Sequence, residues 1–416
     1  MILSAVSYSQ TPITNINFQD AINTCLDTNP RDGLCSTSEF GKMPDWDVSN
    51  VIDMSMAFSQ KILFNGDLSA WDVSNVTDMT AMFYNAQAFN SDISSWNVAN
   101  VVSMKTMFAA CLNFNSDISA WNVSNVTDMT ALFNATYSFD QDISTKEVTV
   151  GENTFIAWDV SKVTNMAGMF LQAKVFNRNI SNWDTRNVTN MYSMFKMADL
   201  FNQPIGEWDT SSVTNMSDLF SEAYSFNQDL NSWDVSQVTD MSYMFYGARS
   251  LTSVTIPKTN AVTNMERMFQ SASSLTSINL PETGAVTDME RMFDGASKLT
   301  TISLPETGAV TNMVGMFEDA TSLTSISLPK TGSVTNMEEM FQGATSLTSA
   351  NLPETAAVTN MNEMFVGATS LTSVSLPETG SVTDMSYMFD GATSLTSISL
   401  PKTGSVTNMS EMFQGA

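Results

Sequence analysis

The sequence predicts a solenoid, a stack of short coils that each contribute a short strand and a one-turn helix. A phrase of the form Val-Thr-Asp/Asn-Met, followed three residues later by Met-Phe or a close variant, returns fifteen times in the 416 residues. The spacing is nearly constant at 24 or 25 residues, which is typical of solenoids. One such unit buries too little apolar surface to offset the entropy of ordering its chain, so the units must stack.

Residues 1–43 precede the first full repeat and are expected to form an N-terminal cap, because a solenoid needs a cover over its first apolar face. The segment 17–26 has the spacing of an amphipathic helix, which the turn residues at 30–33 would end. The residues on its apolar stripe are Phe18, Ile22, Cys25 and Leu26.

The three cysteines divide into a pair and a single residue. Cys25 and Cys35 flank a polar loop in the cap, and we expect a disulfide between them; the alternative is two reduced thiols packed in the cap. A disulfide would indicate an oxidising compartment. Cys111 takes the place of a small residue in other repeats, which predicts a buried free thiol.

Residues 44–248 form a first series of 25-residue repeats, marked by tryptophan. The eight tryptophans fall in two regular runs: Trp46, Trp71, Trp96, Trp121 and Trp158, Trp183, Trp208, Trp233. Each is followed five residues later by a valine, and six of them also two residues later, as Val76 and Val73 follow Trp71, which favours a ring that lines the core. The alternative is an outward column on which sugars could stack.

Residues 249–416 form a second series of 24-residue repeats, in which proline takes the place of tryptophan. The markers are Pro257, Pro281, Pro305, Pro329, Pro353, Pro377 and Pro401. The segment 323–328 alternates apolar and hydroxyl residues, which predicts a short strand that the next proline ends. Met337, Met340 and Phe341 are spaced as in one helical turn, and Gly343 suits the left-handed residue that would end it.

A thirteen-residue insertion, 145–157, replaces the single residue found in other repeats. Its segments 148–150 and 154–156 flank a Gly-Glu-Asn turn and predict a β-hairpin. Insertions in solenoids map to surface loops, so the hairpin is a candidate interaction site. The candidate residues are Lys146, Glu152, Asn153 and Phe155. A tolerated bulge without a role is an equal alternative.

Composition excludes several classes of function. With 17 Lys and Arg against 43 Asp and Glu, the net charge of -26 repels nucleic acid and anionic lipid. No apolar run is long enough for a membrane helix, and residues 1–6 lack the features of a secretion signal. The chain has no histidine, which rules out His-based catalysis and His metal sites. We expect no enzyme and no cofactor.

Two files of aspartates are the strongest metal candidates. Asp67, Asp92, Asp117 and Asp142 form one file, with Asn179 in the same position; Asp47, Asp72, Asp159, Asp184, Asp209 and Asp234 form the other, with Asn97 and Asn122. Calcium between the files is one hypothesis. The favoured one is that each carboxylate accepts hydrogen bonds from turn amides, a task that Asn can also perform. The recurring methionines are predicted to be core rather than soft-metal ligands.

Several Asn-x-Ser/Thr triplets could accept glycans in a eukaryotic secreted chain. The repeat itself generates many of them, so those outside the common phrase are the better candidates. The sites singled out are Asn134 and Asn179, followed by Asn75 and Asn187.

The repeat resembles a known family. The phrase from Trp71 to Met79, followed by Met82-Phe83 and by Phe89 to Ile93, is similar to the repeat of BspA-type leucine-rich-repeat surface proteins, including the mycoplasma lipoprotein form. The second series is similar to another variant of that family, and the resemblance covers about 44–416. It implies a leucine-rich-repeat solenoid outside the cell, used in adhesion and surface interactions, without a defined ligand.

These observations predict a non-catalytic scaffold at the cell surface that binds a protein or a glycan, without nucleic acid and without membrane insertion. The alternative is a structural subunit of an extracellular filament, sheath or appendage that self-associates end to end. The last repeat stops at 413–416 without a polar cap, so we expect either further chain after it or docking on another subunit.

Overall fold

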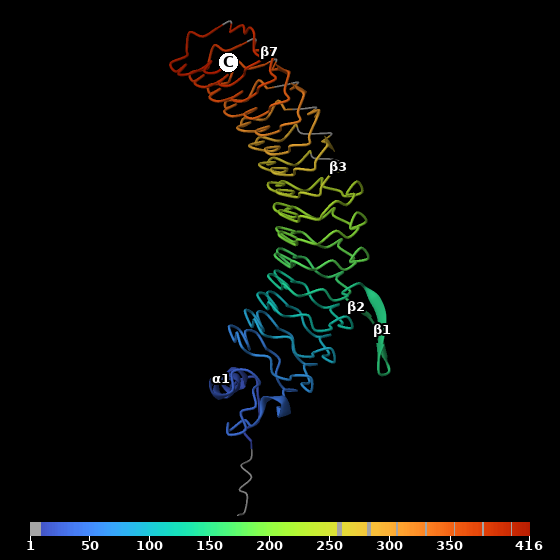
Figure 1. The fold of residues 1–416 in the computed structure, drawn as a ribbon. Coiled ribbons are helices and arrows are strands. Elements are labelled where there is room, and N and C mark those ends of the chain that lie inside the picture. Colours follow the sequence, from blue (N-terminus) through green and yellow to red (C-terminus); the bar gives the residue numbers. More distant parts are fainter. Residues whose placement is uncertain are drawn as a thin grey trace, which may run out of the picture. The chain divides into compact units, whose positions relative to one another are not determined.

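The computed structural model describes residues 10–255, 260–280, 284–304, 307–328, 331–352, 354–376, 378–400 and 402–416. The chain divides into two compact units, the first ending at Asn187 and the second beginning at Val188. Within each unit, coils of the repeat lie one on another (Figure 1). Coils of the tryptophan type occur in both units. The seven marker prolines and the start at 1–6 lie outside the described residues.

The first unit begins with a helical cap. Helix α1 spans Phe18–Thr28 and buries Phe18, Ile22, Cys25 and Leu26, the stripe expected from the sequence. A short 3-10 helix, η1, spans Met43–Asp45 and leads into the first tryptophan coil. The Phe18 ring packs edge-on against Trp71, with 5.7 Å between ring centroids. The cap therefore covers the apolar end of the stack.

Successive coils pair in parallel through the Asp, Asn or Ser that precedes the first methionine of the phrase. In the first unit the bridges run from Asp53 through Asp78, Ser103 and Asp128 to Asn165. In the second unit they run from Asn190 to Asn408. Each bridge pairs the same position of two neighbouring repeats. Equivalent residues of successive repeats therefore lie next to each other in the stack.

The predicted one-turn helix after this bridge is wrong. The segment is a series of tight turns with left-handed residues, such as Ala81 at φ 54° and Asn85 at φ 56°. Alternate amides bond to the next coil: Ala81 N–H donates to Lys105 O at 2.8 Å, whereas Met82 N–H donates to Met79 O at 3.1 Å. Because half of the amides bond between coils, the 1→5 bonds of a helix cannot form. Gly343, at φ 69°, is left-handed as predicted, within these turns.

Regular strands occur in the second unit where alternating segments predict them. They are β3 (Ser253–Thr255), β4 (Ser277–Asn279), β5 (Ser325–Ser327), β6 (Ser349–Asn351) and β7 (Ser373–Ser375). They pair in parallel as β3-β4 and β5-β6-β7. In β5, Ile326 is buried between exposed serines, as the alternation requires. In the first unit the matching position instead carries an asparagine ladder: Asn65 Oδ1 accepts the amide of Asn90 at 2.7 Å, and Asn90 Oδ1 that of Asn115.

The core consists of columns of identical side chains. All eight tryptophans and the recurring methionines of the phrase up to Met388 are buried, so both core predictions are confirmed. Tryptophan indoles also have a polar role that the sequence does not reveal, as Trp96 and Trp121 show. The indole N–H of Trp96 donates to Leu68 O at 3.1 Å, and that of Trp121 donates to Ile93 O at 3.2 Å. Phenylalanine rings stack beside them, with Phe83 and Phe108 5.7 Å apart. This repetition leaves only the surfaces to differ between coils.

Candidate functional site

The insertion forms the predicted hairpin on the side of the first unit (Figure 1). Strand β1 spans Lys146–Val150 and strand β2 spans Asn153–Ala157. The register pairs Val148 with Phe155 and Val150 with Asn153. These side chains share one face of the hairpin, because side chains alternate along a strand.

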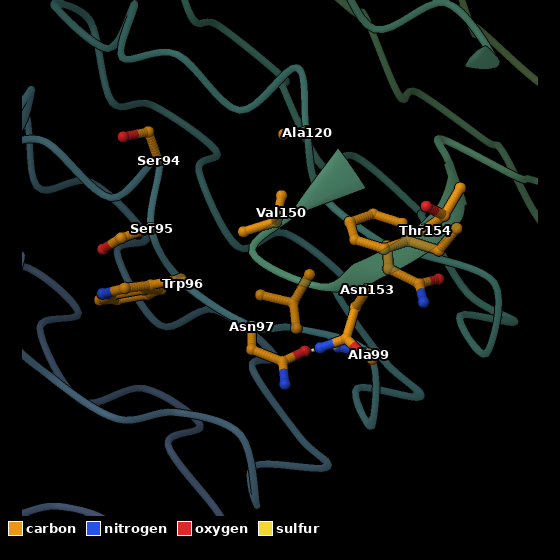
Figure 2. Close-up of a pocket in the computed structure, with 12 residues that line it drawn as sticks. Ser94, Ser95, Trp96, Asn97, Ala99, Ala120, Val150, Asn153 and Thr154 are labelled. Carbon is orange, nitrogen blue, oxygen red and sulfur yellow. Dashed lines mark hydrogen bonds between the residues drawn. The ribbon is translucent and has the colours of Figure 1, made fainter. Parts of the chain in front are cut away.

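The hairpin and the neighbouring coils border a partly open cavity of about 420 Å³. Its lining residues are Ser94, Ser95, Trp96, Asn97, Val98, Ala99, Ala120, Asn122, Val150, Asn153, Thr154 and Phe155. Figure 2 shows the segment 94–99 on one side and hairpin residues on the other. The volume lies within the usual range for small-molecule sites. The cavity is therefore large enough to hold a ligand group.

The floor of the cavity is fixed by two asparagines at equivalent positions of neighbouring coils. Asn97 Oδ1 accepts the amide of Ala99 at 3.2 Å, and Asn122 Oδ1 accepts that of Ser124 at 3.1 Å. Because each oxygen is held by a turn amide, each NH₂ group points elsewhere and can donate to a ligand. All lining residues are uncharged, whereas the file to which these asparagines belong is otherwise acidic.

The structure separates the four residues selected from the sequence. Asn153 and Phe155 line the cavity. Glu152 is exposed at the turn, and Lys146 Nζ lies 2.6 Å from Asp142 at the base of the hairpin. Sequence analysis missed Asn97 and Asn122 as site residues, although their replacement of Asp was visible. That replacement is the sequence signal at these two positions, and it points to a site only once the hairpin is known to cover them.

The hairpin is joined to the stack through a strained residue. Trp158 adopts φ 49°, whereas the other left-handed non-glycine residues lie in the turns that follow each bridge. A left-handed conformation at a bulky residue costs on the order of 1–3 kcal/mol. The coil nevertheless keeps its ordinary bond, from Trp158 Nε1 to Ile118 O at 2.9 Å.

Deleting residues 146–157 restores the 25-residue spacing from Trp121 to Trp158 and leaves Thr145 as the single connecting residue. We expect the free energy of unfolding to stay within about 1 kcal/mol of wild type, because relief of the backbone strain at Trp158 offsets the lost hairpin contacts. Thermal and urea unfolding followed by circular dichroism measure this. A loss of more than about 3 kcal/mol would show that the hairpin is part of the fold itself.

The aspartate files are held by turns. Asp67 Oδ1 accepts the amide and hydroxyl of Ser69 at 2.9 and 2.7 Å, and these hydrogen bonds, the hydroxyl's first, lower the pKa of Asp67. Asp92 repeats the arrangement with Ser94, and its pKa is lowered for the same reason. These contacts support the turn-amide hypothesis. Among the described residues, no group of three or more acidic or cysteine side chains is placed to hold a metal ion.

Stability is expected to fall in acid. Burial raises the pKa of Asp142, but hydrogen bonds from Lys146 and Ser144 outweigh burial and lower it to about 2. Folded-state values below the ordinary 3.8 mean that the stabilisation is present above pH about 4 and is lost as the pH falls towards 2. The melting temperature measured between pH 5 and pH 2 should drop steadily. Replacing Asp67, Asp92 and Asp142 by Asn, which keeps the acceptor oxygens, should make that drop shallower; an identical pH profile would contradict this explanation.

The glycan acceptors differ in their surroundings. The side-chain amides of Asn75 and Asn187 donate to carbonyls of the preceding coil, at 2.9 and 2.7 Å, so a glycan there would break a contact between coils. Asn179 caps a turn by accepting the amide of Ser181, and Asn134 is half-buried. Glycosylation at these sites stays a prediction. Cys111 is buried, and burial raises the pKa of its thiol, as expected for a structural cysteine.

The geometry defines the class of the protein: each unit is a solenoid of stacked repeats, and the first carries a lateral hairpin with a cavity beneath it. The family of domains described as "Mycoplasma protein of unknown function, DUF285" matches residues 34–146, 145–257, 249–354 and 349–416, so the chain belongs to that family. No curated protein matches the sequence. The narrower assignment to the BspA type stays a prediction.

Solved structures of leucine-rich-repeat proteins are similar to the chain. A protein of T. pallidum is 25% identical over 41% of this chain and 78% of its own, with a TM-score of 0.34. One from Eubacterium ventriosum is 16% identical over 72% and 82%, with a TM-score of 0.33. A leucine-rich cell surface protein from Faecalibacterium prausnitzii is 17% identical over 63% and 88%, also with a TM-score of 0.33. In the parts of the chain that the structure describes, no helix has the length and hydrophobicity to cross a bilayer.

Proposed function

We propose that the protein is a non-catalytic binding scaffold outside the cell or at its surface, and that it holds its ligand between the hairpin and the coils beneath it. The observation that carries this proposal is the cavity of about 420 Å³ lined by Asn97, Asn122 and the inner face of the hairpin. The stack supplies a rigid floor, and the insertion supplies a wall that ordinary repeats lack. A site of this kind combines apolar surface with a few fixed polar groups, as ligand sites generally do.

Two further features agree with this role. The chain has no histidine, and each repeated carboxylate of the two files accepts a hydrogen bond from a turn amide. The file carboxylates therefore share one kind of environment, whereas acid-base chemistry needs two that differ. The cap carries two cysteines at bonding distance, with 1.92 Å between their sulfur atoms, which suits an oxidising compartment. The proposed location is therefore extracellular.

The test compares the full chain with the variant that lacks residues 146–157. Both are applied to a slide that carries purified extracellular proteins and glycans, and bound protein is quantified by fluorescence. The wild-type chain is expected to bind at least one class of probe, and the deletion variant, shown to be folded by circular dichroism, is expected to lose that binding. Equal binding by both chains, or none by the wild type, would refute the proposal.

A further inference from the structure

We infer that the ligand held beneath the hairpin is a neutral glycan, whose terminal sugar ring enters between Phe155 and the amides of Asn97 and Asn122. This inference rests on the proposed function and specifies the class of ligand. It follows from the charge of the lining, the orientation of its polar groups and the part of the hairpin that faces the cavity.

The first argument is charge. None of the lining residues is ionisable, in a chain whose net charge is -26. An anionic ligand would find no cation in the cavity, and a cation would find no carboxylate there. In the file that includes Asp47 and Asp72, the two coils under the hairpin carry Asn97 and Asn122 instead. Asn122 is also half-buried, where a carboxylate would lose solvation. The site therefore suits an uncharged polar group.

The second argument is the pattern of donors and apolar surface. The NH₂ groups of Asn97 and Asn122 occupy equivalent places on neighbouring coils, next to the Trp96 and Trp121 rings, whose centroids lie 6.5 Å apart. They can donate to two hydroxyl oxygens of one sugar. Phe155 and Val150 lie opposite, on the inner face of the hairpin. A sugar has this dual character, with hydroxyl oxygens at its edge and C–H groups on its face that pack against an aromatic ring.

The third argument separates a sugar from an extended peptide. A peptide that adds to a sheet needs an unpaired strand edge. Val150, Asn153 and Phe155, which share the inner face of the hairpin in the β1–β2 register, line the cavity together with Thr154 from the other face. Its opposite wall, at 94–99, consists of turns and irregular backbone. The wall at 94–99 thus offers side-chain contacts and no regular strand to which a peptide could add.

The experiment uses the full chain on an array of glycans with neutral ends and their sialylated or sulfated counterparts, beside extracellular proteins. The expected result is binding to a subset of neutral glycans, with weaker binding to the acidic counterparts. The double variant Asn97→Asp with Asn122→Asp keeps the turn acceptors but removes the donors, and should weaken binding roughly tenfold or more. Phe155→Ala should also weaken it.

The matched control is Asp47→Asn with Asp72→Asn, which makes the reverse change in the same file, at residues that do not line the cavity. It should bind like wild type. A preference for acidic glycans, or full binding by the Asn97→Asp, Asn122→Asp variant, would overturn the inference. If proteins alone are bound and that binding requires the hairpin, the glycan inference is wrong and the proposed function stands. Binding of neutral glycans that survives deletion of 146–157 would refute both.

Discussion

Replacing Phe108 by alanine should lower the free energy of unfolding of the first unit by about 4 kcal/mol. Its side chain is 0% exposed. The ring stacks on Phe83 and Phe133 in the neighbouring coils, at 5.7 and 6.0 Å, and on Phe114 in its own coil, at 3.9 Å. Truncation therefore removes contacts on three sides, and a rigid stack of coils cannot collapse into the space left behind.

The loss should also be local, because a repeat contacts mainly its neighbours. Amide hydrogen exchange is expected to accelerate in the coils around 101–140 more than in the cap. Urea unfolding supplies the overall free energy. Phe155→Ala is the control, because the half-buried ring of Phe155 lies on the hairpin. This variant should lose less than about 1 kcal/mol of unfolding free energy. A Phe108→Ala effect as small as that of the control would show that the phenylalanine column does not hold the stack together.

The sequence was sufficient to predict the solenoid, its core columns and the hairpin. The first two follow from a repeated pattern of residues, and the hairpin follows from an interruption of that pattern. The 25-residue spacing of the tryptophans places them above one another only if the coils stack. The alternation in 323–328 produced β5, with Ile326 inward. The helical turn was wrong because local spacing of apolar residues does not show where backbone amides bond. Half of them, such as that of Ala81, bond to the next coil.

The candidate site was only half predictable for a related reason. Phe155 and Asn153 belong to the insertion, which can be recognised in the sequence because it interrupts the repeat. Asn97 and Asn122 lie far from it in the sequence, and only the direction in which the hairpin folds brings them beneath it. A turn needs an acceptor that either Asp or Asn can supply, so the replacement alone did not indicate a site. Whether an Asn at this position belongs to a site depends on which part of the chain covers the turn.

The second large effect is expected in the cap. Removing the link between Cys25 and Cys35 by a double change to serine should lower stability by about 3 kcal/mol, because the link closes a loop of sequence separation 10 in the unfolded chain. Both cysteines are buried, at 0% and 1% exposure, so serine hydroxyls there would add a desolvation cost. Through α1, the change would also loosen the contact of Phe18 with Trp71.

The measurement is the melting temperature with and without a reducing agent. Wild-type protein should melt earlier when reduced, and the Cys25→Ser, Cys35→Ser variant should melt early in both conditions. Cys111→Ala is the control, because that thiol is buried in the stack and outside the cap; its variant should respond to reductant as wild type does. If the reductant leaves the wild-type melting temperature unchanged, the two cap cysteines are not linked in the purified protein. The cap would then be held by α1 packing alone, and the argument for an oxidising compartment would be lost with the disulfide.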